Sequence, residues 1–248
     1  MRPAGLPYGS CGELTPTERF LWESSGFLVI EDALSPEEVH DCLAACERAH
    51  ADLRFIQQHT VPVPEQQPTA VVDEWRQLGC AYEFDPALER LMDHPSVFSK
   101  IAPLLGEHFS LHSSWCTMVP AGSPGGGVHQ DASGPSAFRL MGTPAPLVQV
   151  RVGFVLTDLS EPNRGNLVVV PGSHNASVPL PPAATDYSGT GGEQHPVSSA
   201  IPLCARAGTA ILFHQGLWHT GGPNIQVHRF ERTNPQDYTG YLPLECCT

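Results

Sequence analysis

The sequence predicts a mostly β protein, an antiparallel barrel supported by flanking helices, and two observations point to it. Helical patterns are concentrated in the first 110 of the 248 residues. From about residue 107, short apolar segments alternate with turns that contain Gly and Pro. Helices followed by a series of short strands favour an antiparallel barrel over a parallel α/β sheet. A chain of this length buries enough surface for one large core.

Residue patterns in the N-terminal part of the chain predict two helices and a strand. Residues 35–38, Ser-Pro-Glu-Glu, supply an N-cap, a proline at the first helical position and a glutamate three residues after the cap, so a helix follows. Residues 26–32 form a short apolar run typical of a buried strand. A helix over residues 15–23 precedes this strand, capped by Thr15 or Thr17.

The rest of the chain predicts one more helix and then strands. The helix covers residues 97–105. Residues 148–156 alternate between apolar and other side chains with a period of two, which is typical of a strand, and residues 166–170 and 209–213 are shorter apolar runs. Residues 175–200 are rich in Pro, Gly, Ser and Thr and predict a long loop, either a lid over a binding site or a plain insertion.

The composition excludes several classes of partner. Thirteen Lys and Arg residues against 26 Asp and Glu residues give a net charge of −13, while charged residues make up only 16% of the chain. The chain is therefore neither a disordered polyanion nor a basic protein that binds nucleic acid or an anionic membrane. We expect a small-molecule substrate, with no nucleic acid and no membrane as partner.

The sequence also predicts a cytoplasmic location. Residues 1–8 contain no apolar core of a signal peptide, and no apolar run reaches the 18 residues of a membrane span. The last three residues, Cys246-Cys247-Thr248, are not a peroxisomal signal. The eight cysteines include no C-x-x-C pair, so we expect them to be reduced thiols.

Two histidine motifs stand apart from the rest. His129-Gln130-Asp131 follows the glycine-rich residues 122–127, and because residues i and i+2 of a strand point to the same side, its imidazole and carboxylate can bind one metal ion. His219 ends a late strand. Two histidines and one carboxylate form the facial triad of non-haem Fe(II) oxygenases, which leaves open metal positions. Histidines without a carboxylate at such a spacing are expected to be structural or solvated: His40, His50, His59, His94 and His108.

These motifs resemble the phytanoyl-CoA dioxygenase family. The resemblance is carried by residues 26–38, His129-Gln130-Asp131, residues 163–174 (NRGNLVVVPGSH) and residues 217–224 (LWHTGGPN), in that order, and it covers roughly residues 15–224. The family comprises Fe(II)- and 2-oxoglutarate-dependent oxygenases with a double-stranded β-helix (jelly-roll, cupin-like) core. The resemblance therefore implies this fold and this chemistry.

The resemblance also implies a set of site residues. It makes His129, Asp131 and His219 the metal ligands and the catalytic centre. In the family, an arginine shortly after the distal histidine binds the C5 carboxylate of 2-oxoglutarate, which a planar guanidinium can pair bidentately. Arg229 is the expected residue, with Arg232 in reserve. Arg229 lies ten residues after His219, whereas nine or eleven is expected, and in a strand an offset of one reverses the facing of a side chain.

Further contacts follow from strand alternation and turns. Gln149 and Arg151 share the face opposite the valines of residues 148–152, so they contact cosubstrate or substrate if that face lines the interior, and are ordinary solvated residues if it does not. His174 either contacts substrate or belongs to a structural turn. Trp218, beside the distal histidine, is expected to pack and to shield the metal from water.

The expected organisation is one dioxygenase domain over residues 1–248. It comprises a helical buttress at about 15–106, a jelly-roll core at about 107–229 and a divergent tail at 230–248. The tail shows no clear alternation, so we expect its final strand to be divergent, truncated or missing. A missing strand would leave the barrel with an unpaired edge.

The expected reaction uses Fe(II), 2-oxoglutarate as cosubstrate and O2 to hydroxylate a small organic molecule, with release of succinate and CO2. Related halogenases replace the metal-binding carboxylate with a small residue, so Asp131 favours hydroxylation, desaturation or another oxidation over halogenation. Two alternatives remain at this point. One is an inactive metal-binding jelly roll that acts as a sensor or scaffold, and the other is a cupin-like metalloenzyme that does not use 2-oxoglutarate.

Overall fold

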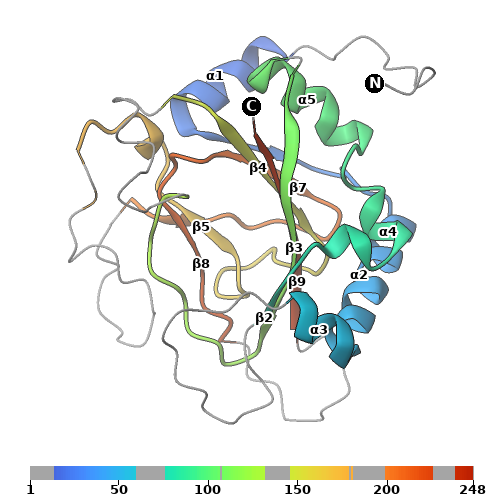
Figure 1. Cartoon of the computed structure of the whole chain (residues 1–248). Helices are drawn as coiled ribbons and strands as arrows, with labels where there is room; N and C mark the ends of the chain where they lie inside the picture. Colours follow the sequence, from blue (N-terminus) through green and yellow to red (C-terminus); the bar gives the residue numbers. More distant parts are fainter. Residues whose placement is uncertain are drawn as a thin grey trace, which may run out of the picture.

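Two antiparallel sheets form the framework of the protein. The computed structural model describes residues 14–59, 76–106, 108–131, 146–178, 180, 199–225 and 238–247. The larger sheet has the strand order β1-β7-β4-β9-β3-β2, and the smaller has the order β6-β5-β8. Figure 1 shows β5 and β8 on one side of β3, β4 and β9, and helices α2, α3 and α4 on the other.

Every strand pair in both sheets is antiparallel, as the sequence predicts. The larger sheet consists of β1 (Phe27–Ile30), β7 (Ala210–His214), β4 (Gln149–Val155), β9 (Tyr238–Cys247), β3 (Ser110–Pro120) and β2 (Arg76–Gly79). The smaller sheet consists of β6 (Ile201–Pro202), β5 (Leu167–Val169) and β8 (His219–Gly221).

The helices predicted at residues 15–23, after residue 35 and at residues 97–105 are present, and two shorter helices were not predicted. They are α1 (Pro16–Ser25), α2 (Pro36–Ala51), α3 (Leu53–His59), α4 (Pro86–Glu89) and α5 (Pro95–Leu105), with short 3₁₀ turns at Ala81–Glu83 and Ser173–Asn175. Thr15 and Ser35 each accept a hydrogen bond from the backbone of a glutamate three residues later, and that glutamate returns a bond to the cap. Both capping boxes satisfy backbone donors that a helix start leaves open.

Helix α2 packs on the outer face of the larger sheet. Its buried side chains are Cys42, Ala45, Cys46 and Ala49. They join one core cluster with the outward side chains of β4, which are Val150, Val152 and Phe154. Because strand side chains alternate, Gln149 and Arg151 lie on the opposite face, toward the smaller sheet. A second core cluster, which includes Val155, Ile211 and Val169, fills the space between the sheets.

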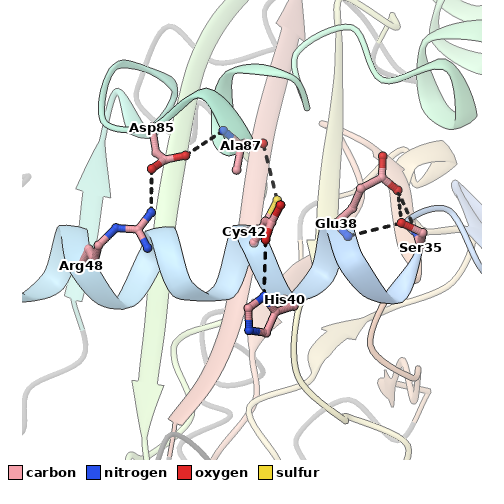
Figure 2. Close-up of polar contacts among 8 residues, drawn as sticks. Ser35, Glu38, His40, Cys42, Arg48, Asp85 and Ala87 are labelled. Carbon is pink, nitrogen blue, oxygen red and sulfur yellow. Dashed lines mark hydrogen bonds and ion pairs between the residues drawn. The ribbon is translucent and has the colours of Figure 1, made fainter.

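Polar contacts hold α2 against α4 (Figure 2). The Arg48 guanidinium lies 2.6 Å from an Asp85 carboxylate oxygen. The other oxygen of Asp85 caps α4 by accepting the Ala87 N–H at 2.8 Å. The Cys42 thiol donates to the Ala87 carbonyl at 3.5 Å. Asp85 therefore both caps the start of α4 and ties α4 to α2.

The positions of strands β9 and β1 in the larger sheet differ from expectation. The tail was expected to lack a complete final strand, but β9 occupies a central position, paired with β3 on one side and β4 on the other. The larger sheet is therefore continuous through β9, at the place where an unpaired edge was expected. The strand expected to be buried at residues 26–32 is β1, which lies at an edge of the sheet, so Val29 is 44% exposed while Leu28 is buried.

Two further expectations concern the long loop at residues 175–200 and membrane-spanning helices. The loop over residues 175–200 is described only at 175–178, 180 and 199–200, so its function as a lid stays a prediction. No helix among the described residues is long and apolar enough to cross a membrane.

Candidate metal centre

The segment from Gly126 to Asp131 runs alongside the turn and strand that carry His219. Gly126 N–H donates to the Gly221 carbonyl at 2.9 Å, and His129 and His219 exchange both backbone hydrogen bonds, each at 2.9 Å. Asp131 N–H donates to the Gln215 carbonyl at 3.2 Å. These bonds make the segment an additional extended neighbour of β8 and fix the H-x-D motif opposite the distal histidine.

The three predicted ligands come together at this ladder. One potential ligand atom from each of His129, Asp131 and His219 lies within 4.8 Å of the other two. The imidazole centroids are 4.5 Å apart. Asp131 and His219 are buried, at 4% and 5% exposure, whereas His129 is exposed. The site is therefore anchored in the interior and opens to solvent at His129.

Backbone carbonyls orient both imidazoles. Nδ1 of His129 lies 2.9 Å from the Gly127 carbonyl, and Nδ1 of His219 lies 2.9 Å from the Leu217 carbonyl. A carbonyl only accepts, so in each ring Nδ1 carries the proton and Nε2 keeps its lone pair for a metal. This shared arrangement fits two neutral histidine ligands.

The surroundings keep the histidines neutral. Burial lowers the pKa of His219 well below its usual value, and the charges of His129 and Arg151 lower it further. The protein atoms packed around His129 also lower the pKa of its imidazole, with a smaller contribution from Arg151. Neutral imidazole is the form that binds metals, so these shifts favour a ligand over a cation.

Arg151 lies at the centre and Gln149 beside it. Nε of Arg151 forms an ion pair with Oδ2 of Asp131. Gln149 is buried, and its backbone N–H donates to the side-chain oxygen of Gln215 at 3.1 Å. The sequence left open whether this face of β4 is interior or solvated, and the structure places it on the interior side, next to Asp131. Arg229 and Arg232 lie outside the described residues, so their contact with 2-oxoglutarate stays a prediction.

Sequence reasoning missed two glutamines that hold the centre together. Gln215 is fully buried, donates from Nε2 to the Pro146 carbonyl at 2.6 Å and accepts from Gln149. Gln130, the middle residue of the H-x-D motif, donates to the Gly216 carbonyl at 2.6 Å. The available signal for Gln215 is a polar residue directly after the apolar strand β7, where an interior polar side chain requires partners.

The structure also places the two other residues that the sequence singled out, His174 and Trp218. His174 is buried, with its ring centroid 5.1 Å from that of His214. Trp218 packs against a small cluster that contains Val128 and Val168, and its backbone N–H donates to Ser173 Oγ at 2.9 Å. Both placements agree with packing and turn functions, and the contact of His174 with substrate stays a prediction.

The model of the phytanoyl-CoA dioxygenase family matches residues 22–228. The chain belongs to the phytanoyl-CoA dioxygenase family. The enzyme class expected from the sequence, a non-haem Fe(II)- and 2-oxoglutarate-dependent dioxygenase with O2 as cosubstrate, is confirmed.

Curated relatives and solved structures agree with the family. An ectoine dioxygenase of Nocardia farcinica is 29% identical over 238 residues, which cover 90% of this chain and 76% of that protein. The crystal structure of EctD from S. alaskensis in its apoform superposes with a TM-score of 0.71 at 19% identity, over 97% of this chain and 79% of that one.

A second solved structure has the same fold. HygX from Streptomyces hygroscopicus, with nickel, 2-oxoglutarate and hygromycin B bound, superposes with a TM-score of 0.65 at 14% identity, over 94% of this chain and 87% of that one. These likenesses confirm the predicted fold class, a mostly β protein with a jelly-roll core and flanking helices.

Proposed function

We propose that this dioxygenase hydroxylates a small organic molecule, with Fe(II) held by His129, Asp131 and His219, and releases succinate and CO2. The observation that carries the proposal is the convergence of the three ligand atoms within 4.8 Å, two of them on buried residues. Two imidazoles and one carboxylate suit Fe(II) and leave positions open on the metal. When bound, the iron supplies the activation of O2 that side chains alone cannot provide.

The protein residues would perform the supporting tasks. The Gly127 and Leu217 carbonyls hold the two imidazoles in the orientation and tautomer that bind metal. The apolar cluster between the sheets, which includes Phe213 with its ring 4.8 Å from that of His219, limits water behind the metal. Substrate would approach from the His129 side, because that is the exposed member of the three.

The cosubstrate requires a cation for its far carboxylate. Strand β9 contains no Lys or Arg, so the arginine expected after His219 must precede that strand, and Arg229 and Arg232 both do. We assign the C5 carboxylate of 2-oxoglutarate to Arg229, with Arg232 in reserve. Gln149 and Arg151 belong to the same pocket because they lie on the inner face of β4.

Known relatives support a small-molecule substrate. The curated relative is named for ectoine, and the neighbouring solved structures include HygX with hygromycin B and SnoN with nogalamycin RO. The net charge of −13 disfavours a nucleic acid or an anionic membrane as substrate. We therefore place the substrate of this chain among small organic molecules.

An anaerobic titration with Fe(II) and 2-oxoglutarate tests the proposal. The expected result is the visible charge-transfer band of the iron–2-oxoglutarate chelate, followed by release of succinate when O2 is admitted. Asp131→Ala should abolish both signals, whereas Arg48→Met, which removes a remote surface ion pair, should preserve them. Folded, iron-replete protein without the band would overturn the proposal. A band without succinate, with substrates of the proposed class present, would instead support the inactive metal-binding alternative.

A further inference from the structure

The two oxygens of the Asp131 carboxylate face different partners. Oδ1 lies 3.6 Å from Nε2 of His219, on the side where the metal ligands converge. Oδ2 forms an ion pair with Nε of Arg151. The carboxylate is therefore divided between a metal-facing oxygen and an arginine-facing oxygen.

The fold fixes this division. Asp131 is 4% exposed, and its backbone N–H is tied to the Gln215 carbonyl at 3.2 Å, so the residue has little freedom to rotate as a whole. Arg151 lies in the middle of β4, paired in register with Phe213 of β7. Its side chain is 19% exposed. A guanidinium on a central strand approaches the carboxylate from a defined direction, unlike an arginine on a mobile loop.

We propose that Arg151 is a positioning residue that reserves Oδ2 of Asp131, so that the carboxylate offers the metal only Oδ1. The inference rests on the proposed metal centre and deepens it. A carboxylate that binds through both oxygens occupies two coordination positions, whereas one that binds through a single oxygen leaves a position for other ligands. In this protein, Arg151 keeps that position available to a chelating cosubstrate.

A cation beside a metal ligand can also act in the opposite way. If Arg151 contributed only its charge, it would compete with a divalent ion for Asp131, and neutral substitutions would tighten metal binding. If the close contact of Nε with Oδ2 is the important feature, loss of the nitrogen at that position weakens binding, and outer-sphere partners of this kind typically contribute about 10–100-fold to metal affinity. The direction of the change separates the two cases.

Three substitutions separate the donor from the charge. Arg151→Gln places an amide nitrogen at the position of Nε without a charge. Arg151→Met places a methyl group there, with neither donor nor charge. Arg151→Lys keeps the charge but places a methylene where Nε lies. Arg48→Met is the matched control, because Arg48 pairs with Asp85 in the helical layer.

The experiment titrates each purified full-length protein with Co(II), whose visible spectrum reports coordination number, and then adds 2-oxoglutarate. We expect Arg151→Gln to stay within about threefold of the wild-type affinity with the same spectrum. Arg151→Met and Arg151→Lys should bind Co(II) at least tenfold more weakly, with an altered spectrum and a weaker response to 2-oxoglutarate. If Arg151→Met does not fold, the comparison of Gln with Lys gives the same answer.

Either of two results would overturn the inference. One is equal Co(II) affinity and spectrum in the Gln and Met variants, and the other is tighter binding in both, which would assign Arg151 a purely electrostatic effect. A wild-type protein that binds no Co(II) would reject the proposed metal centre itself, and the inference with it. Normal binding by the wild type with unchanged variants would reject the inference alone.

Discussion

His129 and His219 are joined through their backbones as well as through the site they form. Each donates its N–H to the carbonyl of the other at 2.9 Å, and their rings lie 4.5 Å apart. The separation of the two imidazoles is therefore set by a hydrogen-bonded antiparallel residue pair. It does not depend on the conformation of long loops. Anything that separates Gly126–Asp131 from β8 should reduce metal affinity.

Gly126 provides the first test of this relationship. A Cβ at this position would lie 2.8 Å from Oγ1 of the buried Thr220, whereas a Cβ at Gly221 would meet no atom within 4 Å. We expect Gly126→Ala to lower the free energy of unfolding by about 1–3 kcal/mol and to weaken Co(II) binding, because the segment must shift away from β8. Gly221→Ala is the matched control and should bind Co(II) normally. Denaturant unfolding and metal titration measure both effects.

A double substitution identifies the cause. Because the predicted clash involves Oγ1 of Thr220, Thr220→Ala should relieve part of the loss caused by Gly126→Ala. We expect a favourable coupling of about 1 kcal/mol in the double-mutant cycle. Strict additivity of the two changes would contradict the steric explanation.

Gln215 should contribute both to the free energy of unfolding and to Co(II) affinity. Gln215→Leu removes the acceptor used by the Gln149 N–H and the donor used by the Pro146 carbonyl, so we expect a loss of about 2–3 kcal/mol in the free energy of unfolding. Co(II) affinity should also fall, because these side-chain bonds hold the turn whose backbone carbonyl at residue 215 accepts the Asp131 N–H. Gln58→Leu, at an exposed position of α3, should change either quantity little. A destabilised variant with unchanged affinity would show that the turn does not position Asp131.

Local signals predicted the parts of the fold that depend on local chemistry. The Ser35 capping box marks the start of α2 because its bonds lie within four residues. The alternation of β4 predicted which face carries Arg151, because the side-chain period of a strand is fixed. The metal triad followed from the same period together with the resemblance to a known family.

Features that depend on distant partners were not predictable in this way. Strand β9 contains Gly240 and Pro243, and a proline argues against a central strand because it cannot donate a ladder hydrogen bond. The structure nevertheless pairs Pro243 with Gly153 inside the larger sheet. The function of Gln215 likewise depends on Pro146 and Gln149, which lie more than 60 residues away in sequence and give no local signal.

A third prediction separates the helical layer from the metal centre. Ser35 accepts the Glu38 N–H and donates to its carboxylate, so Ser35→Ala should cost about 1 kcal/mol of stability. Because Ser35 lies on the helical layer, Co(II) affinity should stay at the wild-type value. Ser24→Ala, which removes two long exposed contacts, 3.4 Å to the Leu21 carbonyl and 3.5 Å to Ser25 Oγ, should change stability less. Equal losses from the two serine substitutions would argue against a stabilising capping box.

The pH dependence of stability should depend on His214. Burial, with a further contribution from the neighbouring His174, lowers the pKa of His214 from 6.5 to about 4. Above pH 6.5 the imidazole is neutral in both the folded and unfolded chains, so its titration has no effect there. Between pH 6.5 and about 4 the unfolded chain takes up a proton that the folded chain excludes. Stability should therefore fall as the pH falls through this window, by roughly 3 kcal/mol from this residue.

His214→Asn tests this assignment because it removes the titrating group but keeps an acceptor for the Gly216 N–H, which Nδ1 of His214 accepts at 2.9 Å. We expect the variant to be less stable at pH 7, because a smaller side chain packs less well against Trp22 and His174. Its stability should nevertheless decline less steeply between pH 6.5 and 4, as measured by urea unfolding at several pH values. Gln58→Leu, at an exposed position of α3 and without a titrating group, should keep the wild-type slope. If His214→Asn shows that slope too, other groups must account for the acid sensitivity, because the only change between the two proteins in this window is the loss of one buried imidazole.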